Sequence, residues 1–227
     1  MIKTVFLDLD DTLLDFHRSE AVAIAETLSG FGIEPTEAVK KRYSEINREM
    51  WEQLELGNMT REQILVRRFE LLFEELGVDV SGLEARHKYE WNLGGSYFYI
   101  DGAEDLLSEL SQKYDLYLMS NGTAAVQDRR IAASGIAKYF KGIFISERVG
   151  YNKPSREFFD LCFGEIPDLD REESIIVGDS LSSDIQGGKN AGILTCHYIP
   201  HGERRDGPAP DYTIRSLGEL PSLLESI

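Results

Sequence analysis

The sequence has only two cysteines among its 227 residues, and they follow no metal-binding or redox pattern. Cys162 and Cys196 stand alone, so the sequence predicts neither a disulfide framework nor a zinc site, as is typical of the reducing cytoplasm. No apolar run approaches the roughly 20 residues that span a bilayer, and the N-terminal segment lacks a basic stretch followed by an apolar signal core. We therefore expect a soluble, cytoplasmic protein with no membrane partner.

Positive charge is also scarce, because 24 Lys and Arg stand against 40 Asp and Glu, a formal net charge of −16. Binding to nucleic-acid backbone or to anionic lipid needs a basic face, so this balance argues against a nucleic-acid polymer as a partner. The four histidines show no partner spacing, and we assign them no role. An acidic protein that binds an anion must instead supply positive charge locally, from a metal ion, a lysine or helix N-termini.

What the sequence does contain is an apolar run at its start that ends in acid. Val5-Phe6-Leu7 has no polar alternation and predicts a strand buried on both faces of a parallel sheet. Asp8 and Asp10 follow directly and, at i and i+2, would share one face of an extended segment. One carboxylate could attack phosphorus to form an aspartyl-phosphate while the other moves the proton. Because two such acids repel each other in a crevice, we expect a cation there, with Mg²⁺ as the first candidate.

Polar groups also follow three later runs of the same kind. Ser120 and Asn121 end the run 116–119, where hydroxyl and backbone donors would suit a phosphoryl oxygen. Lys153, set before a proline, could offset the charge of nucleophile and phosphate. Asp179 follows the run 174–178 and could coordinate the metal, while Asp184 could bind it through water or orient Lys153. Each motif alone also has a plainer interpretation, as a turn, a helix cap or a solvated lysine.

Taken in order, these motifs resemble those of the haloacid dehalogenase-like (HAD) hydrolase superfamily, in its phosphatase branch, over almost the whole chain. The resemblance implies that Asp8 is the nucleophile and Asp10 the acid/base, and that Lys153 takes part in catalysis. It implies that Ser120 and Lys153 bind phosphate, with Thr12 and Asn121 helping to hold the motif loops and phosphate. It implies that the Mg²⁺ ligands are Asp8, Asp179 and the Asp10 carbonyl, and that Asp184 lies next to these ligands without binding the metal directly.

The domain organisation follows from where strands are predicted. Residues 16–99 contain no convincing strand, and their apolar spacing and capping signals indicate helices near 21–28, 36–56, 60–76 and 83–91. After residue 102, strands near 115–120, 143–146, 174–178, 193–198 and 211–214 alternate with helices. We expect an α/β protein, with a Rossmann-like parallel sheet core (residues 1–15 and 96–227), helices on both faces, and an inserted α-helical cap (residues 16–95).

Several segments resemble one branch more closely, the house-cleaning pyrimidine 5′-nucleotidases that act on non-canonical nucleotides. Among them are residues 47–51, 67–69, 145–150 and 187–192. The resemblance implies a small-molecule phosphomonoester substrate. We expect a monomer or homodimer. Because a closing cap supplies contacts to the leaving group, we consider four cap residues as substrate contacts, Asn47, Trp51, Arg68 and Tyr97. An aromatic residue such as Trp51, at helical spacing from other apolar residues, is more often part of a core.

Other activities share this scaffold and stay open at this point. They are a phosphoglycolate or sugar-phosphate phosphatase, a β-phosphoglucomutase-like mutase, a 2-haloacid dehalogenase, and a non-catalytic member that binds phosphate compounds. A dehalogenase would need neither metal nor a second acid, so Asp10, Asp179 and Asp184 argue against it. A mutase would need a cap that recaptures a bisphosphate.

Overall fold

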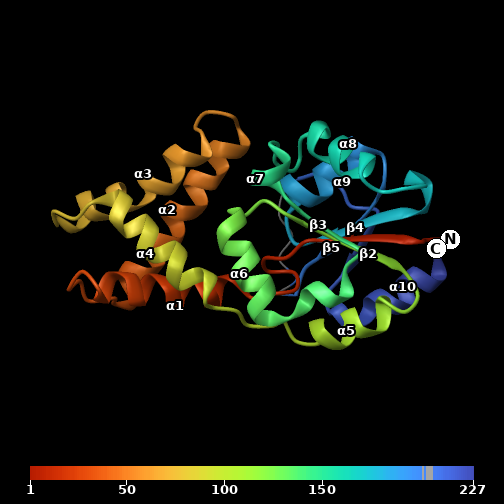
Figure 1. Ribbon diagram of the computed structural model, residues 1–227, viewed down its shortest axis with the longest axis horizontal. Coiled ribbons are helices and arrows are strands. Elements are labelled where there is room, and N and C mark those ends of the chain that lie inside the picture. The colour runs from red at the N-terminus through yellow and green to blue at the C-terminus, as the bar shows by residue number, and fades with distance from the viewer. Residues whose placement is uncertain (201, 203–206) are drawn as a thin grey trace. The chain divides into compact units, whose positions relative to one another are not determined.

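The computed structural model describes residues 1–200, 202 and 207–227, so one of the four histidines, His201, lies outside the described residues. The chain divides into two compact units, each with its own set of elements (Figure 1). The α/β unit comprises Met1–Asp15 and Phe98–Ile227, and the helical unit comprises Phe16–Tyr97. The second boundary lies two residues beyond the expected one.

The α/β unit is built on one parallel sheet. Its strands are β1 (Thr4–Leu7), β2 (Asp115–Ser120), β3 (Gly142–Ile145), β4 (Ser174–Gly178), β5 (Leu194–Tyr198) and β6 (Tyr212–Ile214). They lie in the order β3-β2-β1-β4-β5-β6, and every neighbouring pair is parallel. The strand positions predicted from the sequence agree with these bounds to within one residue, and the predicted fold class is confirmed.

Helices cover both faces of this sheet. They are α5 (Ala103–Leu110), α6 (Ala124–Ser134), α7 (Ser146–Val149), α8 (Arg156–Gly164), α9 (Gln186–Ala191) and α10 (Leu220–Ser226). Short 3₁₀ turns η1 (Ile136–Tyr139), η2 (Arg171–Glu173) and η4 (Leu217–Glu219), and a π-helical turn η3 (Leu181–Ile185), connect them.

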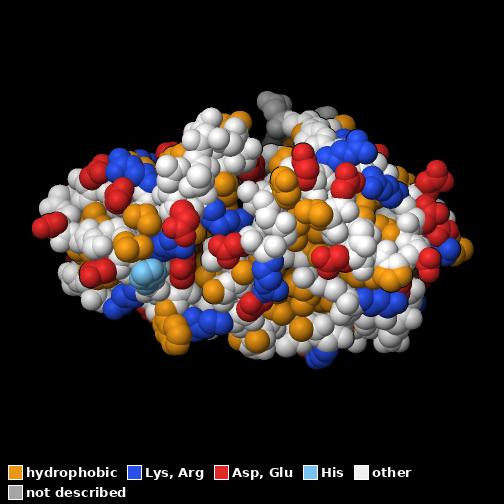
Figure 2. Space-filling view, turned by 45° about the horizontal axis from the view of Figure 1, so that its top comes forward, with side chains coloured by type: hydrophobic (Ala, Val, Ile, Leu, Met, Phe, Trp, Pro, Cys, Tyr) orange, Lys and Arg blue, Asp and Glu red, His pale blue; other side chains and the backbone are white. Residues whose placement is uncertain are grey.

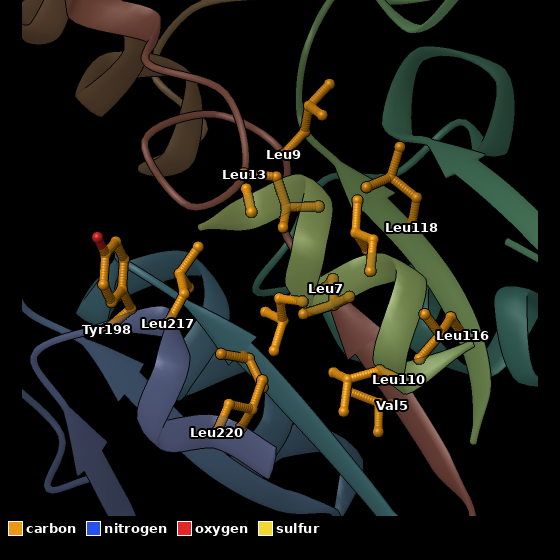
Figure 3. Packing of buried hydrophobic residues seen from close by; sticks show 14 of the residues in the cluster. Val5, Leu7, Leu9, Leu13, Leu110, Leu116, Leu118, Tyr198, Leu217 and Leu220 are labelled. Carbon is orange, nitrogen blue, oxygen red and sulfur yellow. The ribbon is translucent and has the colours of Figure 1, made fainter. Parts of the chain in front are cut away.

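Successive residues of β1 pack into two different cores, as the period of two in a strand requires. Val5 and Leu7 join a cluster that includes Leu110 of α5 and Leu220 of α10 (Figure 3). Phe6 points to the other face, into a cluster with the aromatic residues of α8. Both faces of β1 are fully buried, which explains why its sequence shows no polar alternation.

The order of the strands determines where a ligand site can form. From β1 the chain moves outward through β2 and β3, and then returns to place β4 on the other side of β1. The carboxyl ends of β1 and β4 therefore flank a point where the winding direction reverses, which is where open α/β sheets bind ligands. Asp8 follows β1 and Asp179 follows β4, so two predicted site residues share this edge.

The helical unit consists of α1 (Phe16–Ser29), α2 (Glu37–Glu55), α3 (Arg61–Leu76) and α4 (Gly82–Gly94). Its ends follow the signals in the sequence. Thr36 caps α2, and Thr60 with Gln63 forms the predicted capping box at the start of α3. Gly77 ends α3 in the left-handed conformation that glycine adopts without strain.

The protein carries an acidic excess, with a formal net charge of −16. On the face shown in Figure 2, Asp and Glu side chains are interspersed with Lys and Arg. Most of the described ion pairs are exposed ones of this kind, which contribute little to stability. Among the described residues no helix combines the length and apolar character that a membrane crossing requires.

Candidate active site

The segment after β1 presents two acids because it turns as soon as the strand ends. The Asp8 amide still donates to the Val177 carbonyl of β4 at 3.0 Å, so the hydrogen bonding between β1 and β4 extends to Asp8. Leu13 and Leu14 then donate to the Leu9 carbonyl and close a tight loop. Asp11 lies in that loop with a left-handed φ of 58°, a conformation that aspartate tolerates better than most residues. Asp8 and Asp10 are thereby fixed at the carboxyl edge.

Lys153 forms the centre of the site. Its ammonium donates to Asp8 Oδ1 at 2.6 Å, to Asp184 Oδ1 at 2.7 Å and to the Met119 carbonyl at 2.8 Å. These contacts use all three N–H donors, and the side chain is only 1% exposed. Burial alone would lower the pKa of Lys153, but the adjacent Asp184 and Asp8 outweigh it and raise that pKa. The lysine is therefore a permanently charged ammonium ion, not a solvated surface group.

Asn121 and Ser120 complete this edge in different ways. The Asn121 side chain donates to the Lys153 carbonyl at 2.9 Å and accepts from the Lys153 amide at 2.8 Å, so it fixes the loop that carries the lysine. Ser120 Oγ accepts from the Gly122 amide at 3.1 Å and from Gln127 Nε2 at 2.8 Å. With both lone pairs taken, the hydroxyl can only donate to a further ligand, as an anionic oxygen requires.

Three carboxylates gather around the lysine. Asp8, Asp179 and Asp184 each place an oxygen within 4.8 Å of the others. Asp184 Oδ2 also accepts from the Ser180 amide at 3.1 Å, so both of its oxygens are engaged. A Cβ at Gly178 would lie 2.2 Å from Asp184 Oδ2, which explains why glycine ends β4. Asp184 thus orients Lys153, one of the two roles considered for it.

These carboxylates are held in an unfavourable setting for negative charge. Burial raises the pKa of Asp8 to about 7, although Lys153 opposes the shift. Burial raises the pKa of Asp179 well above its ordinary value, and repulsion from Asp8 and Asp184 adds to this. One ammonium ion does not balance three carboxylates, so a divalent cation would relieve the repulsion.

The oxygen donors here fit magnesium. Mg²⁺ prefers oxygen ligands and keeps several waters, so few protein groups are needed. Asp8 and Asp179 are the carboxylates available to it, because Asp184 is already engaged by Lys153 and Ser180. The Asp10 carbonyl is the third ligand expected from the family resemblance.

Asp10 has partners that the sequence motifs did not indicate. Arg130 Nη1 pairs with its Oδ1, and Gln127 Nε2 donates to its Oδ2 at 2.6 Å. Both partners lie on α6, where no strand-end signal marks them; only the packing of α6 brings them to Asp10. His197 was likewise given no role, yet its ring hydrogen-bonds the Asp179 carbonyl at 2.8 Å. Thr12 is fully buried, and among the described residues its hydroxyl has no hydrogen-bond partner.

Two of the four cap residues considered as substrate contacts are engaged inside the helical unit. Asn47 donates to Glu20 Oε1 at 2.7 Å and accepts from Arg68 Nη1 at 2.7 Å, and all three side chains are buried. The Arg68 guanidinium also lies 4.8 Å from the centre of the Tyr89 ring. Sequence reasoning expected these polar groups to face a substrate, whereas the structure places them in a buried chain of hydrogen bonds. Helix periodicity does not reveal that a buried acid on α1 would be their partner.

The other two candidates are less enclosed. Trp51 is partly buried, with the Arg61 guanidinium 5.5 Å from the centre of its ring. Tyr97 is 37% exposed. Their role as substrate contacts stays a prediction.

Arg68 provides a test of its own role. Arg68→Met should lower the free energy of unfolding by about 3 kcal/mol, because it leaves the buried Glu20 and Asn47 without their cation. Burial already raises the pKa of Glu20, with Arg68 among the groups that oppose the shift. Urea unfolding would measure the loss. Arg67→Met is the control, because the neighbouring Arg67 pairs with Glu74 at the surface and should matter by less than about 1 kcal/mol. A raised KM with unchanged stability in Arg68→Met would instead indicate a substrate contact.

Comparison with known proteins places the chain in one family. Residues 2–192 match the haloacid dehalogenase-like hydrolase family. The chain belongs to this family. It is an enzyme of the hydrolase class, and the resemblance drawn from the strand-end motifs is confirmed.

Individual relatives are similar in sequence to this chain over nearly its full length. The HAD-family protein YfnB of Bacillus subtilis is 39% identical over 98% of this chain and 95% of its own. A crystal structure of YfnB bound to magnesium superimposes with a TM-score of 0.94, covering 98% of both chains. Pyrimidine 5′-nucleotidase PynA of Streptococcus pneumoniae is 36% identical over 98% of this chain and 95% of its own. Pyrimidine 5′-nucleotidase YjjG of Escherichia coli is 31% identical, over 97% and 96%.

Proposed function

We propose that the protein is a Mg²⁺-dependent phosphomonoester hydrolase that acts through an aspartyl-phosphate on Asp8. The observation that carries this proposal is the contact of Asp8 with the buried Lys153 at 2.6 Å, beside a second acid at Asp10. Lys153 favours the ionised, nucleophilic form of Asp8 and would offset the incoming phosphate. A dehalogenase would use the same nucleophile but would not need the acids at Asp10 and Asp179.

The residues divide the reaction into two halves. An Asp8 carboxylate oxygen attacks phosphorus, and the bond from phosphorus to the ester oxygen breaks while Asp10 gives a proton to that oxygen. Ser120 donates to a phosphoryl oxygen, and the positive charge of the nearby Lys153 offsets the charge that moves onto the phosphoryl group. In the second half, Asp10 takes a proton from water as the water oxygen attacks phosphorus, and phosphate leaves Asp8. A magnesium ion bound to Asp8, Asp179 and the Asp10 carbonyl would supply further charge neutralisation at the phosphoryl group.

We propose pyrimidine nucleoside 5′-monophosphates, including non-canonical ones, as the substrates. What supports this is the identity of 36% and 31% to two proteins named as pyrimidine 5′-nucleotidases, over nearly the whole chain. We place the reaction in the cytoplasm, which suits two buried free thiols, at Cys162 and Cys196.

Phosphate release from a panel of esters tests both levels of the proposal. The panel contains pyrimidine and purine 5′-monophosphates, sugar phosphates and phosphoglycolate, each with Mg²⁺ and with EDTA. Pyrimidine monophosphates should give the highest kcat/KM, and EDTA should abolish release. Another leading ester would overturn the nucleotide assignment and keep the chemistry, whereas no release from any ester would overturn both.

The raised pKa values of Asp8 and Asp179 predict that the stabilisation of the fold by Mg²⁺ depends on pH. Because the pKa of Asp8 lies near 7 in the folded protein against 3.8 when unfolded, the metal-free fold binds extra protons in that interval and loses stability as pH rises through it. Mg²⁺ binds the ionised carboxylates, so its stabilising effect should grow over the same interval. Thermal unfolding at pH 5 and pH 8, with Mg²⁺ and with EDTA, would measure this. An equal shift of Tm at both pH values would contradict the assignment, and Asp179→Asn should reduce the difference.

A further inference from the structure

The second acid of the site is held from behind by two side chains of α6. Arg130 pairs with one oxygen of Asp10, and Gln127 Nε2 donates to the other at 2.6 Å. Arg130 and Gln127 are almost fully buried, at 1% and 2% exposed, whereas the Asp10 side chain is 28% exposed. The carboxylate is therefore fixed on its protein side and open on the other.

Gln127 also joins this acid to the predicted phosphate-binding serine. Its Nε2 lies 2.8 Å from Ser120 Oγ, and its Oε1 accepts from Arg130 Nη1 at 3.0 Å. Arg130, Gln127, Asp10 and Ser120 thus form one continuous set of hydrogen bonds. Residue 122 must be a glycine for this arrangement to fit, because a Cβ at Gly122 would lie 2.4 Å from Gln127 Nε2.

A buried guanidinium is costly to desolvate unless it is paired, and here its pairing partner is the proposed acid/base. We infer that Arg130 and Gln127 are positioning residues that fix the Asp10 carboxylate for proton transfer. Each Asp10 oxygen has two lone pairs, so one per oxygen remains for the leaving group or the attacking water. Small errors of placement cost much in such a step, about 10²-fold for 1 Å. This inference rests on the proposed function.

The leaving group of the substrate distinguishes positioning from a general structural role. Expulsion of an alkoxide needs a proton from Asp10, whereas p-nitrophenolate leaves without one. In Arg130→Met and Gln127→Met, kcat for the best nucleotide of the panel should fall about 10²-fold with KM nearly unchanged. With p-nitrophenyl phosphate, the initial burst of nitrophenolate should keep its wild-type rate while steady-state turnover slows, because hydrolysis of the aspartyl-phosphate still needs Asp10 as base.

A double-mutant comparison adds a second readout. Asp10→Asn combined with Arg130→Met should be no slower than Asp10→Asn alone, because the arginine acts only through that acid. Asp128→Asn is the control on α6. It removes an exposed carboxylate that pairs with Arg148 of α7, and it should keep wild-type kinetics. Arg130→Lys and Gln127→Met cover the case in which Arg130→Met does not fold.

Three results would contradict a positioning role for Arg130 and Gln127. A nitrophenolate burst slowed as much as nucleotide turnover, additive losses in the double mutant, or a rise in kcat would overturn the positioning role. If the wild-type protein releases phosphate from no ester, the proposed function fails first. If the wild type is active and the α6 variants match it, only this inference fails.

Discussion

Asp8→Asn should reduce phosphate release by at least about 10⁴-fold for every ester, because the amide cannot attack phosphorus and no other group at this edge can replace it. The substitution keeps the shape of the side chain and an oxygen that can accept from Lys153, so the local geometry should survive. It also removes a buried negative charge that is held at a raised pKa. The Tm of the metal-free protein above pH 7 should therefore stay level or rise. Steady-state kinetics and thermal unfolding of the same preparation would measure both effects.

The combination of lost turnover and retained stability is what separates a nucleophile from a structural acid. Asp160→Asn offers a matched control, because Asp160 is a half-exposed carboxylate of α8 paired with Arg171. That variant should keep wild-type kcat. Residual activity of Asp8→Asn above about 1% of wild type would show that another group attacks phosphorus, and it would remove the basis of the aspartyl-phosphate mechanism.

Part of the carboxyl edge could be predicted from the sequence because three of its groups end or directly follow a buried strand. Parallel strands end at one edge, so Asp8, Ser120 and Asp179 had to lie near one another once the runs before them were assigned as strands. Lys153 follows no strand directly. The two-way hydrogen bond with Asn121 brings its loop to the site.

The groups that could not be predicted come from helices. Gln127 and Arg130 share a face of α6, but nothing in their spacing says which loop that face meets. For Arg68 and Asn47 the sequence left two interpretations open, because a guanidinium and an amide on neighbouring helices suit a ligand and a buried acid equally well. Only the position of Glu20 on α1 decides between them.

Lys153→Met should produce the largest combined effect on the molecule. The lysine separates Asp8 from Asp184, and its removal leaves both carboxylates buried without their shared cation. Truncating one partner of a buried ion pair typically costs about 3–5 kcal/mol, so the metal-free variant should be destabilised by that amount at pH 8 and should not turn over. The loss should shrink toward pH 5, because protonation of Asp8 relieves the repulsion. Urea unfolding at the two pH values would measure the change.

A double mutant identifies the source of that loss. In Lys153→Met with Asp184→Asn, one uncompensated charge is gone, so much of the stability should return while turnover stays absent, because the phosphate still lacks its cation. Lys113→Met removes an exposed lysine paired with Glu109 and Glu225 and should cost less than about 1 kcal/mol. If the double mutant were as unstable as Lys153→Met, packing of the lysine stem rather than its charge would hold this edge together. If it regained activity, Lys153 would serve the fold alone, and phosphate binding would depend on Ser120 and the metal.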